Sequence, residues 1–325
     1  LLLSRYMALG ASSRYRSYQY LPFLRSQGID VHISPLLSDL YLRRLYSGES
    51  SPKLDLLHSH MIRVRQMLGA RKYDLVWLEY EALPWLPFWI ESLLLRNRVP
   101  YVVDYDDAIF HRYDQHPSRL MRLILRKKIA GVMRNAALVV AGNRYLADYA
   151  REAGAKHVEI LPTVIDLTRY RKKSECDTAM FTIGWFGTPM TSRYLNEIAE
   201  ALREICSDGR TRFVAIGPGR LDFDNIPHDI REWNSDNEVQ EIQNFDVGIM
   251  PLIDSPWERG KCGHKLIQYM ACGKPVVASP VGVNSDIVEH GVNGFLASTP
   301  KEWVEALTKI RDDQELREKM GNAGR

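Results

Sequence analysis

Residues 260–265 read Gly-Lys-Cys-Gly-His-Lys and stand directly before an apolar helical run that ends at Gly273. Glycines let a ligand approach the backbone closely, and the first turn of a helix carries the positive end of its dipole. Lys261 and Lys265 add charge, and His264 adds a ring donor. This combination predicts an anion site that holds a diphosphate. The alternative is an amphipathic helix whose lysines are only solvated.

Two further glycine turns follow apolar strands of the C-terminal half. Gly187 follows FTIGWF, with Arg193 in the first turn of the next helix, and Gly217 follows FVAI. Each turn alone is a weak signal, since glycine commonly ends a strand. We expect the turns at Gly187 and Gly263 to converge across an interdomain gap and to form a pocket for negative charge.

Carboxylates gather where strands of the N-terminal half end. The run PYVVDYDDAIF, residues 100–110, carries Asp104, Asp106 and Asp107. One of them is expected to orient a hydroxyl group of a ligand. The alternative for Asp106 and Asp107 is a helix N-cap. Glu81, after another strand, either faces a ligand or is an exposed loop acid.

The sequence does not favour a required metal ion. An Asp-x-Asp pair can bind a divalent cation that also holds diphosphate oxygens. Here, however, a helix dipole and basic side chains already supply positive charge. Cys262-x-His264 offers only two nearby ligands, fewer than a zinc site needs.

Strands alternate with helices along the whole chain, which predicts parallel sheets with crossover helices. The predicted fold class is α/β, with two Rossmann-like domains, 1–165 and 166–325, whose parallel sheets face a central cleft. The polar stretch 164–178 is interpreted as the linker between them. The expected strands are 1–4, 30–34, 74–78, 100–104, 137–141, 157–161, 181–186, 212–216, 229–233, 246–250, 275–279 and 294–297. The expected helices are 13–26, 54–69, 84–96, 117–134, 143–153, 192–206, 236–243, 263–272, 284–290 and 300–310.

Length and composition limit the function classes. The chain has 325 residues, which favours two domains over one core. A net charge of +3 gives no support for nucleic-acid binding, and four scattered cysteines suggest a reducing compartment. The longest apolar stretch, 83–95, is too short to cross a bilayer, and no signal peptide is recognised. We therefore expect a cytoplasmic protein, with a short start missing before Leu1.

A basic segment, residues 118–137, suggests peripheral contact with the inner face of a membrane. A basic amphipathic helix can lie on an anionic surface. Trp85, Phe88 and Trp89 are candidate interfacial anchors, and the alternative is a solvated outer helix face. The basic residues are Arg119, Arg122, Arg126, Lys127, Lys128 and Arg134.

The C-terminal half resembles the retaining glycosyltransferase family 4, which has the GT-B fold. The residues that carry the resemblance are MACGKPVVASPVG, EHGVNGFLA and KEWVEALTKIRDDQELREKMGNAGR, preceded by the turns IGWFGTP, VAIGPG and DVGIMPL. The N-terminal half matches more loosely, through SRYRSYQYLPFLRSQGIDV and LVVAGNRYLADYAREAG. Relatives usually add a closing helix beyond the point where this sequence stops, and its absence suggests truncation or disorder.

The resemblance implies an enzyme of class EC 2.4 that transfers a sugar with retention from a UDP- or GDP-sugar. It places the donor in the C-terminal domain and the acceptor, a saccharide or a lipid-linked glycan precursor, in the N-terminal domain. It also suggests a role in polysaccharide biosynthesis. The remaining alternatives are a catalytically impaired sugar-nucleotide-binding subunit and a GT-B sugar-nucleotide epimerase. An oxidoreductase is disfavoured because GPGRLD at 217–222 lacks the third glycine of a dinucleotide-binding motif.

The chain departs from the family at a Glu-x7-Glu segment. Gln268 stands where relatives carry the glutamate that binds the donor ribose, and Gly260 stands where they carry the glutamate that contacts the sugar. Glu258 is a candidate replacement for the latter, or a solvated loop acid. After the Gly187 turn, Arg193 falls at the family's lysine position and Thr188 at its arginine position. The sequence therefore predicts a variant subgroup with GKCGxKxxQYMA.

The predicted site has two sets of residues. Lys265 and Arg193 neutralise the leaving nucleoside diphosphate, and Asp106 or Asp107 acts beside the reacting sugar. Trp233 and Glu238 lie near the position at which relatives hold the base. The predicted donor-binding residues are Gly187, Thr188, Gly217, Trp233, Lys261, Cys262, Gly263, His264, Leu266 and Gln268.

Overall fold

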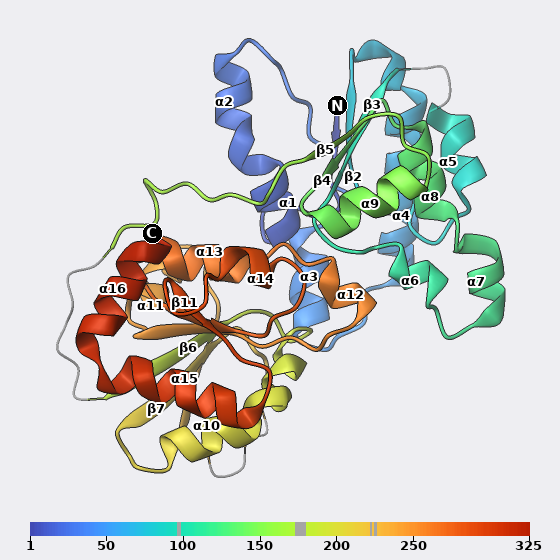
Figure 1. The fold of residues 1–325 in the computed structure, drawn as a ribbon. Helices are drawn as coiled ribbons and strands as arrows, with labels where there is room; N and C mark the ends of the chain where they lie inside the picture. Colours follow the sequence, from blue (N-terminus) through green and yellow to red (C-terminus); the bar gives the residue numbers. More distant parts are fainter. Residues whose placement is uncertain (96–98, 173–179, 222, 224–225) are drawn as a thin grey trace. The chain divides into compact units, whose positions relative to one another are not determined.

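The computed structural model describes residues 1–95, 99–172, 180–221, 223 and 226–325 (Figure 1). They form two compact units. The first comprises Leu1–Thr163 with the short segment Arg259–Cys262, and the second comprises Val164–Glu258 with Gly263–Arg325. The predicted linker 164–178 and Cys176 fall wholly or partly outside the described residues.

The first unit is built on a five-stranded parallel sheet with the order β1-β2-β3-β4-β5. Alternate residues such as Val76, Leu78 and Val103 face one side of this sheet and are fully buried. Helix α2 lies over the opposite side, beside Trp77 and Val102. The strands are β1 (Leu2–Leu3), β2 (Val76–Glu79), β3 (Tyr101–Tyr105), β4 (Leu138–Ala141) and β5 (Val158–Ile160).

The predicted strand at 30–34 is wrong. This segment pairs with β1 through the isolated bridge between Leu2 and Ile33, in which the Leu2 N–H donates to the His32 carbonyl and the Ser34 N–H to the Leu2 carbonyl, and no continuous ladder forms. The helical elements of the first unit are α1 (Ala11–Arg16), η1 (Tyr18–Tyr20), α2 (Leu21–Ser26), α3 (Asp39–Tyr46), α4 (Lys53–Leu68), η2 (Ala70–Lys72), α5 (Phe88–Leu95), α6 (His111–Asp114), α7 (Arg119–Leu125), α8 (Lys128–Asn135) and α9 (Arg144–Glu152).

The single amphipathic helix expected over 117–134 is also wrong, because the chain turns at Arg126 and Lys127 and forms α7 and α8. Helix α8 packs into the unit and buries Lys128, which therefore does not belong to a basic outer face. Across the described residues, no helix combines the length and the apolar character needed to cross a bilayer.

The second unit contains a six-stranded parallel sheet with the order β11-β10-β9-β6-β7-β8. Its central strand β6 is buried throughout, as expected for a parallel strand covered on both faces. The strands are β6 (Phe181–Phe186), β7 (Thr211–Ile216), β8 (His228–Arg231), β9 (Val247–Met250), β10 (Val276–Ala278) and β11 (Gly294–Leu296).

Helices cover both faces of this second sheet, with α10 and α15 on one side and α11 and α13 on the other (Figure 1). The predicted α/β class with two parallel sheets is confirmed. The helical elements are η3 (Ser192–Ile198), α10 (Ala199–Cys206), α11 (Glu238–Gln243), α12 (Pro256–Arg259), α13 (His264–Ala271), α14 (Asn284–Ile287), α15 (Pro300–Asp312) and α16 (Gln314–Gly324).

Candidate functional site

The N-cap residue that precedes helix α13 is a glycine that no other residue could replace without strain. Gly263 has φ +64°, and a Cβ atom there would lie 2.3 Å from Ile287 Cδ1. The next residues, His264 and Lys265, form the first turn, where the helix dipole is positive. Leu266 contributes a fully buried side chain to the core, so only its backbone can take part in binding.

The start of α13 lies at the carboxyl end of β6. Lys265 Nζ is 4.4 Å from the centroid of the Trp185 ring, and the Tyr269 hydroxyl accepts a hydrogen bond of 3.1 Å from the Phe186 N–H. Gly187 follows directly after this strand. The turn at Gly187 and the start of α13 therefore both lie at the carboxyl ends of the strands of one sheet. This follows because β9, which precedes α13, is the neighbour of β6. Both turns belong to the second unit, so the expectation that they converge across an interdomain gap is wrong.

The Gly217 turn lies beside the Gly187 turn because β6 and β7 are neighbours. Gly217 has φ +71°, and a Cβ atom there would lie 2.5 Å from the Gly187 carbonyl oxygen and 3.0 Å from Trp233 Cβ. The Thr188 N–H donates a hydrogen bond of 3.1 Å to Thr191 Oγ1, which fixes the position of Thr188. Four predicted donor-binding residues, Gly187, Thr188, Gly217 and Trp233, thus form one small region.

Arg193 is paired with a buried glutamate. Its Nη2 atom lies 3.2 Å from Glu258 Oε1, while 63% of the arginine side chain is exposed. Glu258 is only 3% exposed and also accepts from the hydroxyls of Tyr194 and Ser255. Hydrogen bonds to Tyr194 and Glu258 raise the pKa of Arg193. The interpretation of Glu258 as a solvated loop acid is therefore wrong.

Gln268 lies in a buried polar cluster that the sequence did not reveal. Its Nε2 atom donates to the Tyr170 hydroxyl at 2.7 Å and to Glu238 Oε1 at 2.9 Å. Trp233 Nε1 donates to Glu238 Oε2 at 2.8 Å. Tyr170 falls in the predicted linker, where no motif marked it. The only indication in the sequence that Tyr170 is buried was an aromatic ring within a charged stretch.

In the first unit, Asp104 is a structural residue. It accepts two hydrogen bonds from Arg16, of 2.8 and 2.9 Å, and both side chains are buried. Burial raises the pKa of Asp104 to about 6, even though Arg16 opposes the shift. Asp106 accepts a hydrogen bond from the Tyr80 hydroxyl. Neither Asp106 nor Asp107 caps a helix, since α6 has Phe110 at its N-cap.

Lys261 and Cys262 belong to the first unit, whereas Gly263 and α13 belong to the second. Lys261 Nζ lies 3.4 Å from Asp107 Oδ1. Asn143 Nδ2 donates to the carbonyl oxygens of Gly260 and Lys261 at 3.0 Å each. Burial raises the pKa of the Cys262 thiol. Lys261 thus stands beside one of the predicted acidic residues.

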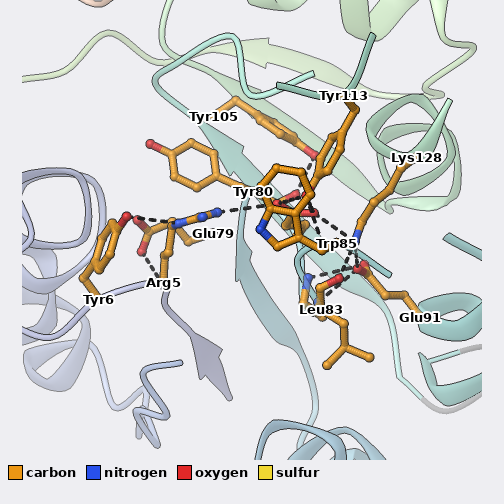
Figure 2. A network of polar contacts seen from close by, with 12 residues as sticks. Arg5, Tyr6, Glu79, Tyr80, Leu83, Trp85, Glu91, Tyr105, Tyr113 and Lys128 are labelled. Carbon is orange, nitrogen blue, oxygen red and sulfur yellow. Dashed lines mark hydrogen bonds and ion pairs between the residues drawn. The ribbon is translucent and has the colours of Figure 1, made fainter. Parts of the chain in front are cut away.

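A buried network of charges supports the acidic edge of the first sheet (Figure 2). Lys128 Nζ lies 2.9 Å from Glu81 Oε2 and 2.9 Å from Glu91 Oε1, and Arg5 Nη1 lies 3.4 Å from Glu81 Oε1. The Tyr113 hydroxyl donates to both oxygens of Glu81 at 2.8 Å. Both expectations for Glu81 are wrong, because it is neither exposed nor available to an acceptor.

This network holds a loop with an unusual backbone. Tyr80 has φ +61° and Trp85 has φ +66°, which lie in the left-handed region of the backbone that residues with a Cβ atom rarely adopt. Between them, Glu91 accepts from the Leu83 N–H at 3.0 Å, and the Tyr105 hydroxyl donates to the Tyr80 carbonyl at 2.6 Å. Strained residues persist where surrounding contacts over-determine them, and they cluster at functional sites.

Within the described ranges, no three His, Cys, Asp or Glu side chains are grouped as a metal site requires. Cys262 and His264, the pair discussed above, fall in different units.

Two known families match most of the chain. Residues 9–163 match the family described as glycosyl transferase 4-like domain, and residues 229–325 match the family described as glycosyl transferases group 1. Both families are glycosyltransferases, and together they match most of the chain, which confirms that it is a protein of this class.

Solved structures share the fold of this chain at low sequence identity. HepE of Anabaena in complex with UDP has a TM-score of 0.65 and 19% identity, over 99% of this chain and 92% of that chain. Sucrose-phosphate synthase of Thermosynechococcus elongatus has a TM-score of 0.62 and 16% identity, over 85% of this chain and 74% of that chain. The fold is therefore of the GT-B type.

Curated relatives match over shorter stretches. The D-inositol 3-phosphate glycosyltransferase of Pseudarthrobacter chlorophenolicus is 26% identical over 222 residues, which are 60% of this chain and 50% of the relative. The enzyme with the same description from Paenarthrobacter aurescens is 36% identical over 82 residues, 25% of this chain and 19% of the relative. The chain thus spans half or less of the length of these relatives.

Proposed function

We propose that this protein transfers a sugar from a nucleoside-diphosphate sugar to a saccharide or lipid-linked glycan acceptor, with retention of configuration. The observation that carries the proposal is the common edge formed by the Gly187 turn, the Gly217 turn and the start of α13. It combines close backbone approach with a helix N-terminus and Lys265, which is the chemistry that a diphosphate requires. HepE, which has the same fold, is solved with UDP and with UDP-glucose, and this supports a uridine nucleotide as the donor.

In this proposal the second unit binds the donor. The bond between the anomeric carbon and the diphosphate oxygen breaks, and its electron pair leaves with the nucleoside diphosphate. Lys265, Arg193 and the dipole of α13 stabilise that developing charge. Glu258 is buried, so it acts by holding Arg193 and does not itself contact the sugar in place of the glutamate that relatives carry at the position of Gly260.

The first unit carries the acceptor in this proposal. Asp106 and Asp107 follow β3, where the carboxyl ends of parallel strands meet and ligands bind in open α/β sheets. The hydroxyl of the acceptor attacks the anomeric carbon and loses its proton, which a carboxylate beside it can accept.

Nucleotide binding tests the donor part. In differential scanning fluorimetry, one of the nucleotides UDP, GDP and ADP should raise the unfolding temperature of the protein. A chloride salt at equal ionic strength should leave that temperature unchanged. Since a ligand at 100 times its Kd stabilises by about 2.7 kcal/mol, a shift of a few degrees is expected. The proposal fails if no nucleoside diphosphate binds at millimolar concentration.

The second candidate is a sugar-nucleotide-binding subunit with little activity, which Gly260 in place of glutamate favours. Measuring UDP released from UDP-glucose by the pure protein separates the two. Binding without any release over hours supports the binding subunit, whereas release supports the transferase.

A further inference from the structure

One buried phenol connects the end of β2 with an acidic residue that follows β3. Tyr80 comes directly after β2, is 3% exposed, and donates a hydrogen bond from its hydroxyl to Asp106 Oδ1. The same hydroxyl lies 3.0 Å from Ser12 Oγ on α1. A phenol has one proton to donate and an ionised carboxylate can only accept, so the Tyr80 proton goes to Asp106 and Ser12 donates to Tyr80. The three side chains thus form a hydrogen-bonded chain with one direction.

The Tyr80 hydroxyl keeps its proton at neutral pH. Burial, together with the carboxylates of Asp106, Asp107 and Glu79, raises the pKa of this hydroxyl well above its ordinary value. The phenol is therefore a permanent donor to one oxygen of Asp106. Among the residues that the structure describes, none hydrogen-bonds the second oxygen of Asp106, so that oxygen is available to a ligand.

Tyr80 is itself held from both sides (Figure 2). Its backbone is left-handed, with φ +61°, and its carbonyl accepts from the Tyr105 hydroxyl at 2.6 Å. The neighbouring residues Glu79 and Glu81 are each 3% exposed, and both bind Arg5, one at its N–H and one at its guanidinium. A glycine would adopt this backbone without strain, so the strain is a cost of placing a phenol here. Because these contacts fix the phenol, they also fix the carboxylate that it binds.

Of the two acids that follow β3, Asp106 is the more firmly oriented. Asp107 Oδ1 lies 3.4 Å from Lys261 Nζ, longer than the roughly 2.8 Å of a good charge-assisted hydrogen bond. Both carboxylates are partly exposed, at the strand ends where open α/β sheets bind their ligands. A group that exchanges a proton with a substrate has to be held close to its working position by its neighbours. Tyr80 meets this requirement for Asp106.

We propose that Tyr80 is a positioning residue for the sugar transfer, which holds Asp106 so that its second carboxylate oxygen takes the proton of the acceptor hydroxyl. The hydroxyl oxygen forms the new bond to the anomeric carbon, and the bond to the diphosphate oxygen breaks with its electron pair. The hydroxyl proton passes to Asp106, and Tyr80 keeps its own. This inference rests on the proposed function, since it assumes that the first unit receives the acceptor.

A double-mutant cycle on UDP release from UDP-glucose tests the inference. Water replaces the acceptor in this reaction and loses its proton in the same step. Tyr80→Phe keeps the ring and removes the hydroxyl. It should lower kcat about tenfold, as for a lost hydrogen bond of ordinary strength, and leave the KM for UDP-glucose within about twofold. Asp106→Asn should lower kcat by about 10²–10⁴, the range for a group that takes a proton.

The decisive value is the effect of the phenol once the carboxylate is gone. In the Asp106→Asn background, Tyr80→Phe should change kcat by less than about twofold, because the hydroxyl then orients no proton acceptor. A purely structural effect would be equally large in both backgrounds. Asp106→Glu, which moves the carboxylate by one carbon, takes the place of Asp106→Asn if the latter releases too little UDP to measure. Ser12→Ala, with a smaller expected loss, takes the place of Tyr80→Phe if that variant does not fold.

Tyr101→Phe is the matched control. Tyr101 lies on β3, is 8% exposed, and donates from its hydroxyl to the Val132 carbonyl at 2.6 Å, so the same substitution removes a buried hydrogen bond that does not involve Asp106. It should lower the unfolding temperature slightly and leave kcat within about twofold.

Three results would overturn the inference alone: equal losses from Tyr80→Phe in both backgrounds, a loss from Tyr101→Phe as large as that from Tyr80→Phe, or an unchanged kcat in Asp106→Asn. A wild type that releases no UDP overturns the proposed transferase function, and this inference with it.

Discussion

Lys265 is the residue that the proposed leaving-group chemistry uses most directly. Its ammonium lies in the first turn of α13 and over the Trp185 ring. Lys265→Ala should lower kcat for UDP release from UDP-glucose by about 10²–10³, since removing one group that stabilises developing charge has an effect of that size. Because the alanine also removes a contact to Trp185, the unfolding temperature is measured in parallel. An unchanged turnover would exclude Lys265 from the mechanism.

Glu79 links residue chemistry to the pH dependence of stability. Burial raises its pKa to about 7 from 4.5, although Ser13 Oγ and the Arg5 N–H donate to it. The folded state therefore holds this proton more tightly than the unfolded state. Its contribution to stability is complete below about pH 4.5 and is lost as the pH rises through about 7.

Glu79→Gln cannot ionise, and its amide oxygen can accept the same two hydrogen bonds. Relative to the wild type, the variant should gain stability between about pH 4.5 and pH 7, by on the order of 3 kcal/mol at the upper end. Urea unfolding across this range measures the difference. A difference that does not change with pH would show that Glu79 titrates alike in both states.

At the scale of elements, the loop between β2 and α5 stores backbone strain at Tyr80. A left-handed conformation costs a residue with a Cβ about 1–2 kcal/mol, and glycine avoids this cost. Tyr80→Gly should therefore be more stable than Tyr80→Ala by about 1 kcal/mol, although both lose the contacts of the ring. Denaturant unfolding compares the two variants.

Tyr101, a buried strand residue of β3, is the control for this comparison. At an ordinary strand position glycine is the worse substitute, so Tyr101→Gly should be less stable than Tyr101→Ala. If the order at Tyr80 is the same as at Tyr101, the positive φ at Tyr80 carries no strain.

Helix α8 is attached to the loop through one buried cation. Lys128 neutralises Glu81 and Glu91, and its side chain has no exposed surface. Lys128→Met leaves two buried carboxylates poorly compensated and should lower the free energy of unfolding by about 3–5 kcal/mol. Lys127→Met, one residue earlier and exposed, should change it by less than about 0.5 kcal/mol. Equal effects of the two substitutions would mean that Lys128 is not buried in solution.

For the molecule as a whole, the surface that suits contact with a membrane is the outer face of α7. Leu120, Leu123 and Ile124 are 63%, 72% and 51% exposed, among the basic residues Arg119, Arg122 and Arg126. Apolar side chains within a basic surface suit an anionic lipid interface. We propose peripheral binding through this helix, with Lys128 excluded because it is internal.

Sedimentation with vesicles tests this binding. Vesicles of 30% phosphatidylserine in phosphatidylcholine should pellet the protein at low salt, about tenfold more than vesicles of phosphatidylcholine alone, and 0.5 M NaCl should reverse the binding. Leu123→Ser should weaken it several-fold. Equal recovery with both kinds of vesicle would contradict an electrostatic contribution from α7.

Alternation of apolar strands with helical runs predicted most of the fold, because each parallel strand is a short continuous apolar run with a crossover after it. Strands such as FTIGWF and DVGIM were found close to their expected bounds. The strand at 30–34 and the single helix at 117–134 were predicted wrongly, since pairing partners and packing decide both. Helix α3 was not predicted, although Ser38 caps it, because the polar residues between its apolar positions obscured the helical pattern.

The amino-acid sequence was enough to assign the class of the protein, because its glycine turns, its apolar strands and the motifs of the C-terminal half depend on local backbone geometry. Which charged residues are internal became evident from the folded chain alone. Glu81, Lys128 and Glu238 are polar residues in loops or amphipathic helices, and nothing within a few positions of them distinguishes a solvated side chain from a buried one. Apart from Trp233, which lies five residues before Glu238, the partners named above lie 30 to 76 residues away in the chain, so only folding brings the opposite charges and donors into contact.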